Sequence, residues 1–129
     1  MVVDSSALVA LLLGEPESQR IAAALEQADL VVISAASLVE VFLVMVGRTG
    51  QDARGSIDAL LRELDATVAP VTEAHWRAAA EAFLRYGKGR HPAGLNFGDC
   101  LTYATARLAG LPLLYKGDDF RATDLASAG

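Results

Sequence analysis

The chain has 129 residues, 53% of them hydrophobic, and a formal net charge of −5 from 11 basic and 16 acidic side chains. This length and apolar content predict one folded domain with a substantial core and exclude a disordered chain. The acidic balance argues against a general nucleic-acid coat, and the longest apolar stretches, Ala7–Leu13 and Val41–Val46, are far shorter than the roughly 20 residues of a membrane span.

The first element is a short apolar strand, Met1–Val3, followed at once by Asp4 and an apolar helix that begins at Ser5 or Ser6. Apolar residues at helical spacing then predict an amphipathic helix, Glu17–Ala28. Asp4 therefore lies at the carboxyl end of a strand that is buried on both faces, the edge at which ligands bind in open α/β sheets.

The middle of the chain continues this alternation with a second apolar strand, Leu30–Ile33. The helix that follows, Ala35–Arg48, is apolar nearly all round, which predicts a buried helix, and Glu40 is its only acidic residue. A helix from about Asp52 to Leu64 comes next. The third strand, Thr67–Val71, contains a proline, which predicts an edge position.

The last part of the chain holds the helix Glu73–Tyr86 and a basic, glycine-rich loop, Gly87–Gly94. A helix opening at Leu95–Asp99 runs to about residue 109, and a fourth strand, Leu113–Tyr115, precedes a polar tail. Strands alternate with helices throughout. The sequence therefore predicts an α/β fold, as a single domain over residues 1–129, with a central parallel sheet of four or five short strands and helices on both faces.

Acidic residues fall at several strand-to-helix junctions on the carboxyl side of this sheet. Asp4 follows the first strand, Glu40 lies in the second turn of its helix, Asp99 lies in the first turn of its helix, and Asp118 and Asp119 follow the last strand. Taken singly, each aspartate could be a helix cap, whereas Glu40 lies too deep to cap its helix. Taken together, the carboxylates repel one another, and a hard divalent cation relieves that repulsion.

Basic residues near this edge add a second feature. Lys88 and Arg90 lie in the glycine-rich loop, and Lys116 follows the last strand. These cations could hold the backbone of a polyanion without base specificity, and helix N-termini at the same edge favour a phosphate.

Five segments carry a resemblance to a known family. They are Met1–Ala7, Ile33–Glu40, Arg85–Pro92, Leu95–Cys100 and Leu114–Phe120. In this order, and over essentially the whole chain, they resemble the PIN domain, most closely the toxin (VapC-type) half of VapBC toxin–antitoxin pairs. The resemblance implies a Mg²⁺- or Mn²⁺-dependent endoribonuclease that a cognate antitoxin inhibits.

The same resemblance assigns the acidic quartet to Asp4, Glu40, Asp99 and one of the pair Asp118 and Asp119. Asp118 is favoured, with Asp119 as the alternative or as an outer residue. Asp4 and Asp99 would bind a metal ion directly, while Glu40 and Asp118 would hold a second ion or its waters. The implied reaction is in-line attack on an RNA phosphodiester by water that the metal activates, which leaves a 5′-phosphate.

Further expectations concern orienting residues and partners. Ser6 or Ser5 and Asn96 are expected to orient the metal-binding carboxylates. The resemblance implies an RNA substrate, a VapB-type antitoxin, a homodimer and a toxin–antitoxin hetero-oligomer, with no membrane association. The alternative is a catalytically idle PIN-like interaction module.

Two other phosphate-handling folds do not fit this pattern. A receiver-like domain needs a phosphoacceptor aspartate at the end of a middle strand, but the second strand ends in Ser34 and the third in Val71-Thr72. A phosphatase needs the motif Asp-x-Asp after the first strand, but the residue two positions after Asp4 is Ser6.

The remaining candidates are expected to be structural. Trp76, Phe83 and Phe97 are assigned to the core rather than to base stacking, and Cys100 is assigned to the core as a small hydrophobe. Val41–Val46 is expected to be core or a dimer face. The single cysteine excludes an internal disulfide and a thiolate zinc cluster and is typical of a reducing cytoplasm. No basic segment precedes an apolar one at the N-terminus, so a signal peptide is not expected.

Overall fold

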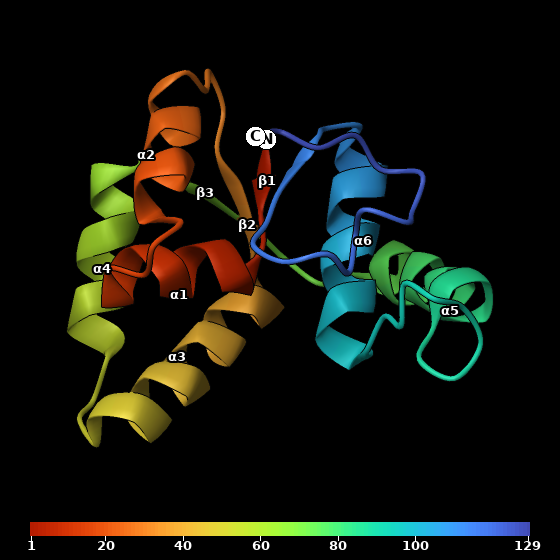
Figure 1. Cartoon of the computed structure of the whole chain (residues 1–129), viewed down its shortest axis with the longest axis horizontal. Helices are drawn as coiled ribbons and strands as arrows, with labels where there is room; N and C mark the ends of the chain where they lie inside the picture. The colour runs from red at the N-terminus through yellow and green to blue at the C-terminus, as the bar shows by residue number, and fades with distance from the viewer.

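The computed structural model describes residues 1–129 and contains one four-stranded sheet (Figure 1). The strands lie in the order β3-β2-β1-β4, and every neighbouring pair is parallel. Their bounds are Val2–Val3 for β1, Val32–Ser34 for β2, Thr67–Ala69 for β3 and Leu113–Leu114 for β4. The predicted parallel sheet is confirmed, with the first strand of the chain at its centre.

Six helices connect and cover these strands. They are α1 (Ser5–Leu13), α2 (Ser18–Glu26), α3 (Ala35–Thr49), α4 (Arg54–Glu63), α5 (Glu73–Tyr86) and α6 (Phe97–Ala109). Their bounds lie within two residues of the predicted ones. Gly110 follows the last residue of α6 in the left-handed conformation, with φ of 65°, which stops the helix.

Helices cover both faces of the sheet, as the sequence predicts (Figure 1). Alternate strand residues point to opposite faces. One core packs against α1 to α4 and takes Val3, Ile33 and Leu114 from the strands. The other packs against α5 and α6 and takes Val2, Val32 and Leu113.

The two edges of the sheet differ, because only the β4 edge pairs with a further segment. β3 is an edge strand, as Pro70 predicts. Along the outer side of β4, the C-terminal segment forms a parallel bridge between Leu113 and Ser127. The Leu113 N–H donates to Ala126 at 2.9 Å, and the Ala128 N–H donates to the Leu113 carbonyl at 2.9 Å. The polar tail therefore pairs with the sheet.

The helix α3 is not buried all round, so that expectation was wrong. Val41 and Met45 pack into the core, but Val39, Leu43 and Val44 are exposed. Only one face of α3 meets the rest of the molecule, and its apolar outer face remains uncovered. None of the helices is long and apolar enough to cross a membrane.

The aromatic residues of α5 and α6 were also wrongly assigned to the core. Trp76 and Phe83 are largely exposed, and Phe97 is 83% exposed. The reason is that α5 turns its small residues inward, with Ala79 and Ala82 buried against α6. The larger side chains are left on the outer surface. Cys100 is buried, as expected.

Candidate functional site

Asp4 combines the end of the central strand with the start of a helix. It is the N-cap of α1, and its Oδ2 accepts hydrogen bonds from the Ser6 N–H at 3.1 Å and from the Ser6 Oγ at 2.6 Å. Its own N–H donates to the Leu114 carbonyl of β4 at 2.9 Å. Only 4% of Asp4 is exposed. The carboxylate is therefore held firmly at the carboxyl edge of the sheet.

A buried threonine, which the sequence reasoning missed, completes the surroundings of Asp4. The Thr102 Oγ1 donates to the Asp4 Oδ1 at 2.8 Å, and the Ser37 Oγ lies 3.3 Å from the Thr102 Oγ1. Ser37 and Thr102 are each one helical turn away from a predicted acid, Glu40 and Asp99 respectively. That i, i+3 spacing is the only signal in the sequence that could have found them.

Glu40 extends from the second turn of α3 to the first turn of α6. A Cβ atom placed on Gly98 would lie 2.6 Å from the Glu40 Oε1, so a side chain at this position would require the Glu40 carboxylate to move. Burial, together with the charges of Asp4 and Asp99, raises the pKa of Glu40 to about 7. The carboxylate thus lies near two other acids, at a helix N-terminus that favours negative charge.

Asp99 lies in the first turn of α6 and forms a capping box with Asn96. The Asn96 N–H donates to the Asp99 Oδ2 at 3.1 Å, and the Asp99 N–H donates to the Asn96 Oδ1 at 2.9 Å. Burial and the charges of Asp4 and Asp119, partly opposed by the hydrogen bond from the Asn96 N–H, raise the pKa of Asp99 to about 6. It is the backbone of Asn96, not its side chain, that contacts this carboxylate.

The two aspartates after β4 lie in different surroundings. Asp118 is 80% exposed and forms an ion pair with Arg121 at 2.9 Å. Asp119 is the member of the pair whose charge acts on Asp99. The charges of Asp4 and Asp99 act on Glu40 and that of Asp119 acts on Asp99, so these four acids lie on the same edge of the sheet, whereas Asp118 pairs with Arg121.

Two of the three predicted cations have partners on the protein. The Lys116 Nζ lies 3.2 Å from the Glu15 Oε1 and 3.7 Å from the Glu17 Oε2. The Arg90 Nε donates to the Leu84 carbonyl at 3.3 Å. Lys88 is exposed. Of the three, Lys116 is the one whose charge is largely compensated within the chain.

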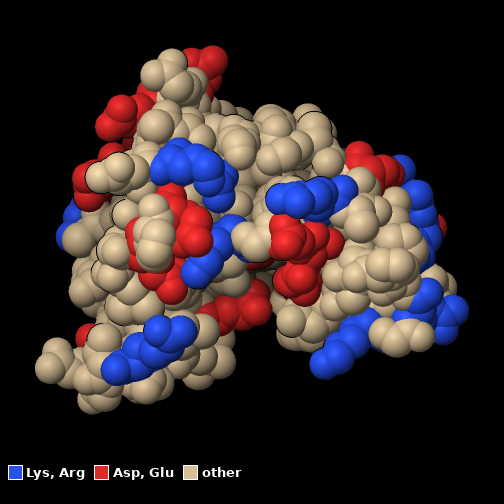
Figure 2. Space-filling view, viewed as in Figure 1, with Lys and Arg blue, Asp and Glu red and all other residues tan.

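The donor set suits a hard divalent cation, although the side chains do not form a finished metal cage. As they stand, no three His, Cys, Asp or Glu side chains are close enough together to hold an ion. The donors at the edge of the sheet are all carboxylates, and burial followed by repulsion from neighbouring acids raises the pKa values of Glu40 and Asp99. A cation with oxygen ligands relieves that repulsion. Acidic side chains gather around the hollow between the two halves of the molecule (Figure 2).

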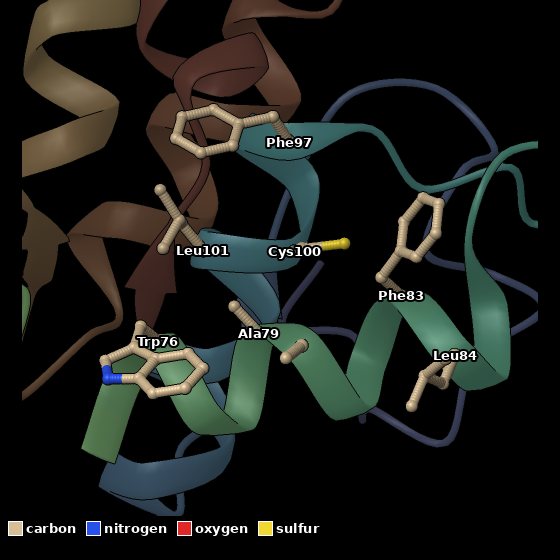
Figure 3. A pocket seen from close by; sticks show the side chains of 8 residues that line it. Trp76, Ala79, Phe83, Leu84, Phe97, Cys100 and Leu101 are labelled. Carbon is tan, nitrogen blue, oxygen red and sulfur yellow. The ribbon is translucent and has the colours of Figure 1, made fainter. Parts of the chain in front are cut away.

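An apolar groove lies beside this site, between α5 and α6 (Figure 3). It has a volume of about 560 Å³, and every residue that lines it is apolar. Its lining consists of Trp76, Ala79, Ala80, Phe83, Leu84, Phe97, Cys100 and Leu101. Phe97 stands between Asn96 and Gly98 in the chain, so the groove borders the acidic site.

Comparisons with known proteins agree with this geometry. The family model described as the PIN domain matches residues 1–125. Ribonuclease VapC36 of Mycobacterium tuberculosis (strain ATCC 25618 / H37Rv) is 49% identical over 130 residues, covering 100% of this chain and 94% of the relative. Ribonuclease VapC of Mycolicibacterium smegmatis is 42% identical, covering 98% of each chain.

Solved structures show the same fold at lower identity. The crystal structure of Mycobacterium tuberculosis VapC20, described as a sarcin–ricin-loop-cleaving toxin, matches with a TM-score of 0.75 and 24% identity, covering 97% of this chain and 95% of that one. A toxin–antitoxin complex from Klebsiella pneumoniae matches with a TM-score of 0.70 and 20% identity, covering 95% and 92%. The sheet order, the acidic edge and the full-length relatives lead to one conclusion: the chain belongs to the PIN domain family, among the VapC ribonucleases.

Proposed function

We propose that this chain is the toxin of a type II toxin–antitoxin pair and a metal-dependent endoribonuclease that hydrolyses RNA phosphodiester bonds. The observation that carries the proposal is the meeting of Asp4, Glu40 and Asp99, from three different elements, at the carboxyl edge of the sheet. Full-length relatives named VapC ribonucleases support the same reaction. Residues 1–129 form one nuclease unit.

The carboxylates have distinct roles in this proposal. Asp4 and Asp99 bind Mg²⁺ or Mn²⁺, and Glu40 with a fourth acid holds a second ion or its waters. Asp119 is the better candidate for the fourth acid, because its charge acts on Asp99 while Asp118 pairs with Arg121. When bound, the ion would activate a water and neutralise charge on the phosphate.

Other residues of the chain orient this machinery and the RNA. Ser6 fixes the Asp4 carboxylate through two hydrogen bonds to Oδ2. The N-terminal turn of α6 directs backbone N–H groups towards the edge where a phosphate would lie. Lys88 and Arg90 of the glycine-rich loop hold the RNA backbone without reading its bases.

Cleavage of total RNA by the purified chain tests this function. We expect cleavage with Mg²⁺ or Mn²⁺, and loss of cleavage in EDTA and in Asp4→Asn. Cleavage that survives Asp4→Asn would contradict the proposed site. Absence of cleavage with either metal, together with tight binding of an antitoxin, would favour the alternative of an idle PIN-like interaction module.

The antitoxin is expected to be of the VapB type and to bring a basic segment to the acidic edge. The charge of the chain, −5, and the repulsion that Asp4 exerts on Glu40 and Asp99 favour a cation from a partner at this position. A peptide of the candidate antitoxin should inhibit cleavage, and replacing its basic residues by alanine should remove the inhibition. Inhibition that is unaffected by those replacements would contradict this mode of binding.

We further propose that the chain is a homodimer whose copies meet through the α5/α6 groove. Taking on the order of 200 Å² for each large side chain, the exposed parts of Trp76, Phe83, Leu84 and Phe97 offer about 450 Å² per copy. Two copies would bury about 900 Å² through these side chains alone, close to the roughly 1,000 Å² of a specific interface. No charge lines the groove, so it is unsuited to an RNA backbone.

Light scattering at micromolar concentration tests the dimer and its location. The unaltered chain should be a dimer, and Leu84→Glu should be a monomer because it places a charge in the α5/α6 groove. Leu43→Glu is the matched control, since Leu43 is equally exposed on the apolar face of α3. A dimer that Leu43→Glu disrupts and Leu84→Glu leaves intact would move the interface to α3.

A further inference from the structure

A pair of buried hydroxyl groups lies directly beneath the acidic site. Thr102 on α6 is 0% exposed and Ser37 on α3 is 2% exposed. The Thr102 Oγ1 lies 2.8 Å from the Asp4 Oδ1 and 3.3 Å from the Ser37 Oγ. The pair therefore connects two helices and the central strand through three polar groups in a row.

The direction of the hydrogen bonds follows from the chemistry of the end group. An ionised carboxylate only accepts, so Thr102 must donate its single proton to Asp4. The Thr102 oxygen can then only accept from Ser37, which makes Ser37 the donor. Such a chain of hydroxyl groups is polarised towards the carboxylate, and each bond strengthens the next.

The hydrogen bonds to Asp4 leave one acceptor position of its carboxylate free. A carboxylate has about four acceptor positions. The Ser6 N–H and Oγ occupy both positions on Oδ2, and Thr102 occupies one on Oδ1. The remaining acceptor position is on Oδ1, so Thr102 decides in which direction that position points.

The same pair also fixes the spacing of the other two acids. Ser37 is one turn before Glu40 on α3, and Thr102 is one turn after Asp99 on α6. One helical turn closer to the site, Glu40 of α3 lies against Gly98 of α6. The helices α3 and α6 therefore contact each other at two successive turns, and the Ser37–Thr102 contact is the one farther from the acidic site.

We propose that Thr102 is a positioning residue that sets the orientation of the Asp4 Oδ1 towards the divalent cation, and that Ser37 acts through Thr102. This inference rests on the proposed metal site. Residues in such an outer layer, when removed, commonly reduce metal affinity by roughly 10- to 100-fold. Thr102 does not contact the RNA or the ion; it acts only through Asp4.

Titration of the purified chain with Mn²⁺, followed by the electron paramagnetic resonance of the free ion, tests this role without relying on activity. Thr102→Val keeps the shape and removes the hydroxyl, and should weaken Mn²⁺ binding by roughly 10- to 100-fold. Thr102→Ser, which keeps the hydroxyl, should bind Mn²⁺ about as tightly as the unaltered chain. Thr105→Val is the matched control, because Thr105 is equally buried on α6 but donates to the Leu101 carbonyl at 2.9 Å.

A double-mutant cycle tests the order of the two hydroxyl groups. Ser37→Ala should weaken Mn²⁺ binding by a smaller factor than Thr102→Val, and the double variant should bind as Thr102→Val does, because Ser37 has no route to Asp4 except Thr102. Melting temperatures, measured alongside, confirm that each variant is folded. If Thr102→Val does not fold, Thr102→Ala, which also removes the hydroxyl, carries the same test.

Three outcomes would overturn the inference. Unchanged Mn²⁺ affinity in folded Thr102→Val would show that the Thr102 hydroxyl does not position Asp4. An equal loss of affinity in Thr105→Val would show that the effect comes from altered packing of α6. Additive losses in the double variant would show that Ser37 does not act through Thr102. If the unaltered chain binds no Mn²⁺, the proposed metal site itself fails, which is a distinct result.

Discussion

Replacing Glu40 by glutamine should make the metal-free protein more stable while it removes the proposed activity. Burial and the charges of Asp4 and Asp99 raise the pKa of Glu40 from 4.5 to about 7. Such a rise corresponds to roughly 3 kcal/mol of lost stability well above pH 7. Glu40 is only partly buried, so solvent screening reduces the figure to about 1–2 kcal/mol. Glu40→Gln keeps the shape and removes the charge.

The sign of the pH dependence follows from proton binding. Between pH 4.5 and 7 the unfolded chain has lost the Glu40 proton that the folded chain still holds, so stability falls as the pH rises through this window. In EDTA at pH 8, Glu40→Gln should melt about 5 °C higher than the unaltered chain. At pH 4.5 the difference should vanish, because Glu40 is then protonated in the folded chain.

Thermal melts at both pH values measure this, with Glu81→Gln as the control for an exposed glutamate on α5. Glu81→Gln should leave the melting temperature unchanged at both. No gain for Glu40→Gln at pH 8, or the same gain at pH 4.5, would refute the reasoning that burial and neighbouring charges destabilise the ionised Glu40.

Three further predictions follow from named contacts. Asp119→Asn should reduce cleavage at least tenfold while Asp118→Asn keeps most of it; the reverse ranking in a cleavage assay would make Asp118 the fourth acid. Gly98→Ala should displace the Glu40 carboxylate, weakening Mn²⁺ binding while the melting temperature holds; unchanged Mn²⁺ affinity would show that this contact is irrelevant. Asp124→Asn removes ion pairs with two arginines and should cost about 1 kcal/mol in urea unfolding with cleavage intact; a loss of cleavage would contradict its purely structural role.

The position of Asp4 could be predicted from sequence because local signals determine it. A strand without a polar face, an aspartate and then a helix-forming run place that carboxylate at the edge of a parallel sheet. The same reasoning located Glu40 and Asp99 in early helical turns, since helix starts can be recognised within a few residues. Their meeting depended on the sheet being parallel, which the alternation of strands and helices predicts.

The Thr102–Asp4 contact could not be predicted, because 98 residues separate its partners in the sequence. The i, i+3 spacing from Asp99 is the only local signal for Thr102, and that spacing alone does not distinguish a buried donor from an ordinary packing residue. The choice between Asp118 and Asp119 was equally inaccessible. It depends on the turn at Gly117, whose φ of 95° directs the following residues, and on the pairing of Asp118 with Arg121.

The exposure of α5 shows a different limit. Trp76, Ala79 and Phe83 follow the helical spacing i, i+3, i+7 and share one apolar stripe of α5, with Ala82 beside it. The pattern predicts a helix but does not say which part of that stripe packs inside. Small residues allow the closer approach to α6, so Ala79 and Ala82 are buried while Trp76 and Phe83 remain exposed. A similar ambiguity led to the wrong expectation that α3 is buried.

The chemistry of the RNA ends that cleavage leaves tests the central claim most directly. If carboxylate-held metal ions direct a water at the phosphodiester, every cut should carry a 5′-phosphate and a 3′-hydroxyl, and EDTA should abolish cutting. Ligation of adaptors that require a 5′-phosphate, with Asp99→Asn as the control, measures this. A 5′-hydroxyl paired with a 2′,3′-cyclic phosphate, formed equally well in EDTA, would show that the ribose hydroxyl attacks and would contradict the account.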